Sequence, residues 1–163
     1  CGCCGACQEG RHGADYLHGR PCGDADLMVE LTQVPSTHID RAWKEGASEL
    51  AKACEVSGGE ITGDQLKMIL SRGERTLIRM ERDGQAAGWG VVRVDQLPNL
   101  RVLMVTDMVA EGADFPEFFG KLKELAASVG CSKVRCAGDE IRERLYRMKC
   151  GFKRVYAILE VDA

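Results

Sequence analysis

Cysteine and histidine, the residue types that most often bind zinc, gather at the start of this chain. Five of the nine cysteines lie within the first 22 residues, and all three histidines lie within the first 38. Cys4 and Cys7 have the spacing of a chelating pair, and His18 and Cys22 form a second pair after ten intervening residues. Three thiolates and one imidazole suit tetrahedral zinc. We therefore predict zinc bound by Cys4, Cys7, His18 and Cys22, with Cys1, Cys3 and His12 as alternate ligands.

Other chemistry is open to the same segment. Cys1, Cys4 and Cys7 form a CxxCxxC series that could ligate an iron–sulfur cluster, although the proline that usually follows the last ligand is absent. Disulfides are a further alternative. So is an unstructured or partner-docked tail, because the apolar content of residues 1–26 is mostly Cys and Ala. We predict a separate arm at residues 1–33 and one domain at residues 34–163.

Charge and hydropathy argue against two classes of partner. The net charge is −3, and acidic residues outnumber basic ones by five to two in residues 1–38, which disfavours nucleic-acid binding. No apolar run approaches the roughly 18 residues that a membrane-spanning helix needs, so no membrane partner is expected. The four cysteines after residue 38 lie in a stretch without histidine. This favours reduced, buried thiols and synthesis in the reducing cytoplasm.

Hydrophobic periodicity predicts an α/β domain. Asp83-Gly84 has the composition of a hairpin turn. A helix at 139–149 is expected to direct Ile141, Leu145 and Met148 inward. A meander followed by β-α-β-α-β gives a mixed sheet flanked by helices, in which the third and fourth strands run parallel. The expected helices are 36–54, 62–73, 116–130 and 139–149, and the expected strands are 75–82, 86–94, 101–109, 132–136 and 152–161.

The order of these elements, together with three short motifs, resembles the GNAT acyltransferase superfamily. Residues 145–152 (LYRMKCGF) are similar to its helix-to-strand signature, and residues 126–130 (AASVG) resemble the A-x-x-x-G that closes its central helix. The hairpin at 79–94 has the family's D-G turn. The resemblance implies a GNAT-like mixed sheet flanked by helices, with the Cys/His-rich arm as an appendage. It also implies acetyl-CoA as acyl donor and an amine as acceptor.

The resemblance places an acetyl-CoA loop after the third core strand. In the family, bare backbone amides at two glycines and the following helix N-terminus hold the pyrophosphate. Here the usual Arg or Gln is absent and a bulky Phe occupies the second glycine's place. Three acidic residues, Glu111, Asp114 and Glu117, add charge that repels a pyrophosphate. The cofactor-binding positions that the resemblance implies are Val109, Ala110, Gly112, Ala113 and Phe115.

Two residues are candidates for catalytic roles. The family's general acid is commonly a Tyr four residues before the signature glycine. Arg147 holds that position here and Tyr146 lies one residue earlier, so Tyr146 is either an acid or a core residue. Asp107 interrupts the otherwise apolar third strand. It is either a general base or an inward carboxylate paired with an arginine.

Two functional classes remain open from the sequence. The segments VPSTHIDRAW and SGGEITGDQLKMIL resemble small GNAT-like proteins encoded among the structural genes of tailed bacteriophages. That resemblance implies a non-enzymatic structural or assembly role, a virion location and other protein subunits as partners. The arm and the basic face at Lys133–Arg154, with eight basic and three acidic residues, would contact those partners in an oligomeric assembly. The alternative is an active acetyl-CoA-dependent N-acyltransferase on an amine.

Overall fold

The computed structural model describes residues 29–56, 59–110 and 115–162, which form a mixed five-stranded sheet with helices around it. The strand order is β1-β2-β3-β4-β5, and every neighbouring pair is antiparallel except β4 and β5, which are parallel. The predicted α/β architecture is confirmed. The strands are β1 (Val29–Val34), β2 (Thr76–Arg82), β3 (Gln85–Leu97), β4 (Leu100–Ala110) and β5 (Lys133–Cys136).

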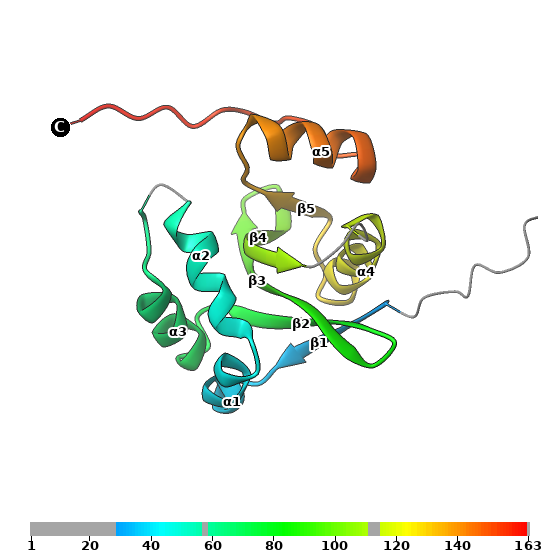
Figure 1. Ribbon diagram of the computed structural model, residues 1–163. Helices are drawn as coiled ribbons and strands as arrows, with labels where there is room; N and C mark the ends of the chain where they lie inside the picture. The colour runs from blue at the N-terminus through cyan, green and yellow to red at the C-terminus, as the bar shows by residue number, and fades with distance from the viewer. Residues whose placement is uncertain (1–28, 57–58, 111–114, 163) are drawn as a thin grey trace, which may run out of the picture.

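Helices cover both faces of this sheet (Figure 1). The helices that follow β1 lie against one face, α4 lies against the other, and α5 lies beyond β5 and packs against α4. The helical elements are η1 (Ser36–His38), α1 (Ile39–Lys44), η2 (Ala47–Glu49), α2 (Leu50–Glu55), α3 (Gly63–Ser71), α4 (Phe115–Ser128) and α5 (Glu140–Cys150).

The alternation of side chains along the strands divides the core into two layers. Successive strand residues point to opposite faces of a sheet. Leu77 is therefore buried with Leu50 and Trp89 beneath α1–α3, whereas its neighbour Ile78 is buried with Phe119 beneath α4. β2, β3 and β4 contribute side chains to both layers, and charged residues such as Arg79, Arg93 and Asp107 interrupt their apolar stretches.

The sheet begins earlier in the chain than the sequence predicts. Residues 29–33, which we assigned to the arm, form most of β1 and pair antiparallel with β2. Val29 is buried and Leu31 is half-buried, while Glu30 and Thr32 are exposed. This short alternation is the period-2 signal of a strand with one covered face. Sequence analysis missed it because only six residues carry it, next to a cysteine-rich segment.

The predicted helix at 36–54 is interrupted. Gly46 has φ +129°, a backbone conformation that side-chain-bearing residues rarely adopt, and it separates α1 from η2. A Cβ at this position would lie 3.2 Å from Trp89 Nε1. The break lets α2 start in a new direction over the sheet, where Leu50 and Cys54 are fully buried.

Two predictions for the C-terminal region are wrong. The expected strand at 152–161 does not form, since residues 151–162 have no regular secondary structure. In α5, Ile141 and Met148 are 82% and 71% exposed rather than inward, and Leu145 is also exposed. The face of α5 that packs inward carries Tyr146 instead. The apolar periodicity of α5 is real, but it lies on the side that faces away from the core.

Gly46 provides a test of the interrupted helix. We expect Gly46→Ala to lower the free energy of unfolding by about 1–3 kcal/mol, because alanine is strained at this φ and its Cβ meets the Trp89 indole. The matched control is Gly120→Ala in α4, where a Cβ meets open space. That variant should gain about 0.5–1 kcal/mol. Urea unfolding measures both, and equal stability of the two variants would contradict the assignment.

Candidate functional site

The most distinctive feature of the sheet is the point where its two parallel strands separate. β5 pairs with β4 only from Val102 to Val105. β4 continues to Ala110, so its residues 106–110 extend beyond the pairing with β5. Backbone N–H and C=O groups on that edge of β4 are therefore free to bind a ligand, among the residues that the structure describes.

A β-bulge lies where this free edge begins. Val91 pairs with Asp107 and Val92 with Val105, so Thr106 is an extra residue in β4. The Thr106 hydroxyl donates a hydrogen bond to the Val91 carbonyl at 3.4 Å and accepts one from Arg75 Nη1 at 3.4 Å. Bulges re-aim side chains and are common beside active sites. This one turns the end of β4 and brings Asp107 toward α2.

Asp107 is the one buried charged residue in the described part of the chain, with 6% of its surface exposed. Its Oδ2 lies 3.6 Å from Arg75 Nη1, and this ion pair is the arginine pairing that the sequence offered as one of two readings. The Cys54 thiol donates to Asp107 Oδ1 at 3.8 Å. Asp107 therefore faces α2, inside the layer formed by α1–α3.

The electrostatics of this cluster make Cys54 unreactive. Burial, followed by the negative charge and the hydrogen bond of Asp107, raises the pKa of the Cys54 thiol to about 11. A thiol with this pKa stays protonated at neutral pH and is not a nucleophile. The cluster is therefore a structural anchor for the bulge, and Asp107 is held by Arg75 and Cys54 rather than directed at the free edge of β4.

Tyr146, the other catalytic candidate, lies on the opposite side of the sheet. Its ring centroid is 5.3 Å from that of Phe119, 5.8 Å from that of Phe152 and 6.2 Å from that of Phe115. Tyr146 is half-buried in this aromatic cluster, and burial raises the pKa of its hydroxyl. The structure thus places Tyr146 against α4 and Asp107 against α2, and it does not bring the two together.

The predicted cofactor-binding residues that the structure describes do not lie together at one site. Val109 pairs with Trp89 across the sheet and packs against the core layer beneath α1–α3, and Ala110 packs with Val29, Met80 and Phe118. Phe115 begins α4 and contacts Tyr146. Gly112 and Ala113 lie outside the described residues. Glu117 is in the first turn of α4, where a carboxylate stabilises the helix and repels a bound anion.

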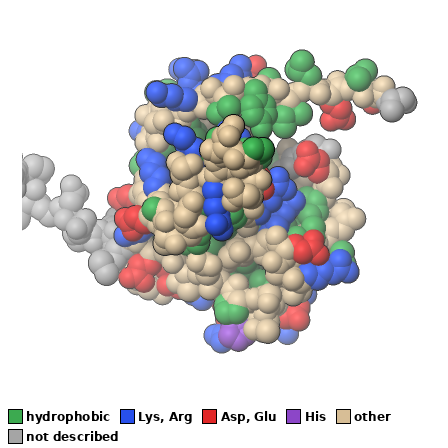
Figure 2. All heavy atoms as spheres, turned by 180° about the vertical axis from the view of Figure 1, so that it is seen from behind, with side chains coloured by type: hydrophobic (Ala, Val, Ile, Leu, Met, Phe, Trp, Pro, Cys, Tyr) green, Lys and Arg blue, Asp and Glu red, His purple; other side chains and the backbone are tan. Residues whose placement is uncertain are grey.

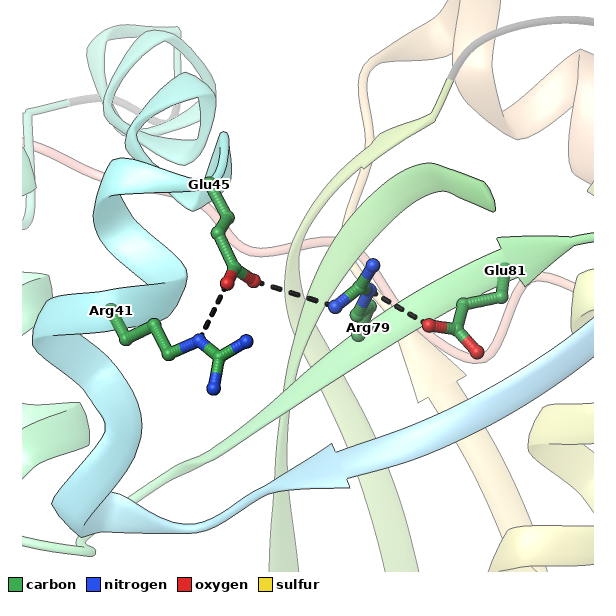
Figure 3. Close-up of polar contacts among 4 residues, drawn as sticks. All are labelled: Arg41, Glu45, Arg79 and Glu81. Carbon is green, nitrogen blue, oxygen red and sulfur yellow. Dashed lines mark hydrogen bonds and ion pairs between the residues drawn. The ribbon is translucent and has the colours of Figure 1, made fainter. Parts of the chain in front are cut away.

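A groove that sequence analysis missed lies between β1, α1 and β2. Its volume is about 220 Å³, and its lining includes Trp89, Arg41, Glu45, Arg79 and Glu81. Figure 3 shows the four charged side chains of this set meeting across the groove. Trp89 pairs with Val109 in the sheet, so the groove is one strand away from the end of β4.

The charged residues of the groove form a continuous chain of ion pairs. Glu45 accepts from Arg41 Nε at 2.7 Å and from Arg79 Nη1 at 3.4 Å, and Arg79 Nε lies 2.9 Å from Glu81 Oε1. The pairing with Arg41 holds the pKa of Glu45 below its ordinary value. The Arg79 guanidinium also lies 5.8 Å from the centroid of the Trp89 ring. The sequence signal is the alternation within β2, which places Arg79 and Glu81 on the same face as the buried Leu77.

No protein-family model matches this chain, and no curated protein matches it. Solved structures do match over most of its length. The aminoglycoside N-acetyltransferase AAC(6')-Iy in complex with CoA is 13% identical, with 88% of this chain and 98% of that chain covered and a TM-score of 0.56. The ribosomal-protein-alanine N-acetyltransferase from Brucella melitensis biovar Abortus 2308 is 14% identical, with 83% and 100% covered and a TM-score of 0.61. The chain has the GNAT acetyltransferase fold.

A third GNAT-fold structure extends this comparison. A predicted acetyltransferase with acetyl-CoA from Clostridium acetobutylicum is 14% identical, covers 83% of this chain and 96% of its own, and has a TM-score of 0.57. At these identities the likeness shows the fold alone, and it confirms the GNAT-like mixed sheet predicted from the sequence. It gives no support to the bacteriophage resemblance.

The predicted zinc ligands Cys4, Cys7, His18 and Cys22, and their alternates, lie outside the described residues. Within residues 29–56, 59–110 and 115–162, no group of three or more His, Cys, Asp or Glu side chains could hold a metal ion. The helices of the same ranges are too short or too polar to cross a membrane. Zinc binding by the arm therefore stays a prediction.

The basic face at Lys133–Arg154 is partly neutralised by its own acids. Arg147 and Arg154 both pair with Glu143, and Arg142 pairs with Asp139. Exposed pairs of this kind contribute little to stability. The role of this face in contacting other subunits stays a prediction.

The Arg75–Asp107 pair gives the second test. We expect Arg75→Met to lower the free energy of unfolding by about 3–5 kcal/mol, because it leaves a buried carboxylate without its counter-charge. Adding Asp107→Asn should restore part of that loss, since the double variant has no uncompensated charge.

The matched control is Arg72→Met, because Arg72 and Glu74 form an exposed pair at 3.8 Å. Its unfolding free energy should stay within about 0.5 kcal/mol of the wild type. Chemical denaturation of the wild type, Arg75→Met, Asp107→Asn, the double variant and the control measures the coupling. Strictly additive effects of Arg75→Met and Asp107→Asn would show that the pair does not hold the bulge.

Proposed function

We propose that this protein is an acyl-CoA-dependent N-acyltransferase, which forms an amide from an acyl thioester and an amine. The observation that carries the proposal is the separation of β4 from β5 just after the Thr106 bulge. The pantetheine arm of CoA contains two amide groups in an extended chain. A free strand edge binds such a chain through the same hydrogen bonds that would pair another strand.

The aromatic cluster of Phe115, Phe119, Tyr146 and Phe152 also supports the assignment as an acyltransferase. Phe115 and Tyr146 supply apolar surface next to the first turn of α4. The raised pKa of Tyr146 keeps its hydroxyl protonated at neutral pH. In the proposed reaction the amine nitrogen forms a bond to the acyl carbon and the carbon–sulfur bond breaks. Tyr146 gives its proton to the leaving thiolate, and the amine's surplus proton passes to solvent.

The start of α4 fits a CoA pyrophosphate poorly, and this favours a second candidate function. Glu117 is in the first turn of α4, and the sequence from 111 to 117 contains no basic residue. Repulsion between a carboxylate and a diphosphate at a helix N-terminus opposes binding. The second candidate is therefore a non-enzymatic structural or assembly component with a GNAT shape. A bacteriophage particle as its setting rests on the sequence segments alone.

Calorimetric titration separates the two candidates. We expect acetyl-CoA and CoA to bind the reduced full-length protein with micromolar dissociation constants, and Glu117→Gln to tighten binding roughly fivefold by removing one repulsive charge. The control is Glu124→Gln, further along the exposed face of the same helix, which should leave the affinity unchanged. Absence of binding up to millimolar CoA would reject the enzyme and favour the structural role.

Tyr146→Phe tests the proton donor. This variant keeps the aromatic packing and removes only the hydroxyl. We expect it to bind acetyl-CoA as the wild type does and to release free CoA about 100-fold more slowly with a panel of amines. Release is measured as free thiol. Unchanged release would show that Tyr146 is a core residue only.

A further inference from the structure

Exposed apolar side chains are concentrated at the C-terminal end of this molecule. Of the twelve large hydrophobic residues that the structure exposes, eight lie between positions 141 and 161. Figure 1 shows residues 151–162 turning back at the end of α5, passing along that helix and then projecting beyond the rest of the protein, and Figure 2 shows hydrophobic side chains along the projecting part. Soluble proteins seldom leave so much contiguous apolar surface in water. We call residues 152–162 the C-terminal segment.

The C-terminal segment has the composition and alternation of a β-strand. Val155, Ala157, Leu159 and Val161 fall on one face of an extended chain, and all are apolar. Arg154, Tyr156, Ile158 and Glu160 fall on the other face. β-branched and aromatic residues favour strands, so what the segment lacks is a hydrogen-bonding partner rather than a strand sequence.

The order of charges within the segment specifies that partner. The sequence from Arg154 to Glu160 reads R-V-Y-A-I-L-E, with a basic end, an acidic end and the small residue Ala157 at its centre. If two such strands run antiparallel about Ala157, Arg154 of one faces Glu160 of the other. The same register places Tyr156 opposite Ile158 and Val155 opposite Leu159. Both ends pair at once because the pattern is complementary to itself.

We propose that a second copy of this chain covers the C-terminal segment, with residues 154–160 of the two copies paired antiparallel about Ala157. Such a contact is isologous, so it closes as a dimer. The inference is independent of acyl transfer. It adds a contact between subunits to the arm and the basic face, whose roles stay predictions.

The outward face of α5 completes the interface. Ile141, Leu145 and Met148 are spaced i, i+4 and i+7, so they form one apolar stripe on the helix that leads into the segment. A two-stranded ribbon alone is marginally stable in water and needs a hydrophobic layer. The apolar face of the ribbon and the stripe of α5 supply that layer for each other.

One contact already made by the segment is compatible with this pairing. Arg154 Nε donates to Glu143 Oε2 at 3.0 Å, and Arg154 Nη2 approaches the same oxygen. An arginine has five N–H donors, so Arg154 can keep Glu143 of α5 and also reach Glu160 of the second copy. Phe152 stays in the aromatic cluster with Phe119 and anchors the start of the segment.

Charge exchange tests the register. We expect reduced full-length protein to be a dimer by sedimentation velocity. Glu160→Arg should raise its dissociation constant about tenfold, because two favourable pairs become two repulsive ones. Arg154→Glu should weaken it similarly. The double variant Arg154→Glu/Glu160→Arg is made in a Glu143→Gln background, so that the new glutamate meets no like charge on α5. It should return to within about threefold of the Glu143→Gln protein, since both pairs between the copies are restored with exchanged signs.

A matched valine pair tests the location. Val155 and Val56 are exposed to almost the same extent, at 64% and 62%. Val155→Ser should weaken the dimer, whereas Val56→Ser should not, and neither change disturbs the core. Wild-type protein that stays monomeric at roughly 200 μM would overturn the proposal, because this concentration is well above ordinary dimer dissociation constants. So would a dimer indifferent to Glu160→Arg and Val155→Ser, or a double exchange that fails to restore association.

Discussion

The buried charge of Asp107 is the constraint around which the centre of this fold is arranged. A buried carboxylate has to be paired, and Arg75, immediately before β2, reaches across β3 to pair with it. The same guanidinium donates to Thr106, so one side chain holds both the charge and the bulge. Cys54 joins α2 to this point. The direction of the last part of β4, and with it the free strand edge, follows from these three contacts.

Two features of the site act in opposite directions on a CoA-like ligand. The edge of β4 offers unpaired backbone groups to an extended amide chain, because its pairing with β5 ends at Val105. The first turn of α4 offers a carboxylate where a diphosphate would need amide donors. Backbone geometry is shared across a fold, whereas the charge at a helix start changes with one substitution. The chain therefore has the strand geometry of the GNAT fold, while the charge at the start of α4 opposes a bound diphosphate.

Local signals in the sequence were reliable and long-range ones were not. The helix start at residue 62, the Asp83-Gly84 turn and the helix end at residue 149 are predicted to within a residue or two, because each depends on neighbours within five residues. In the structure Thr62 caps α3 together with Gln65, and Gly151 ends α5. The ion-pair chain from Arg41 to Glu81 was missed, since nothing in the sequence says that α1 crosses β2. The outward stripe of α5 was read as core because periodicity identifies an apolar face without saying what covers it.

Trp89 gives the groove a property beyond its shape. The chain has two tryptophans, and this one lines the groove beneath the Arg79 guanidinium. A positive charge over an indole shifts the energy of its excited state, so indole emission is sensitive to where that charge lies. A molecule that enters the groove and displaces Arg79 is therefore expected to change the fluorescence of Trp89. The protein thus carries an internal fluorescent reporter beside its chain of ion pairs from Arg41 to Glu81.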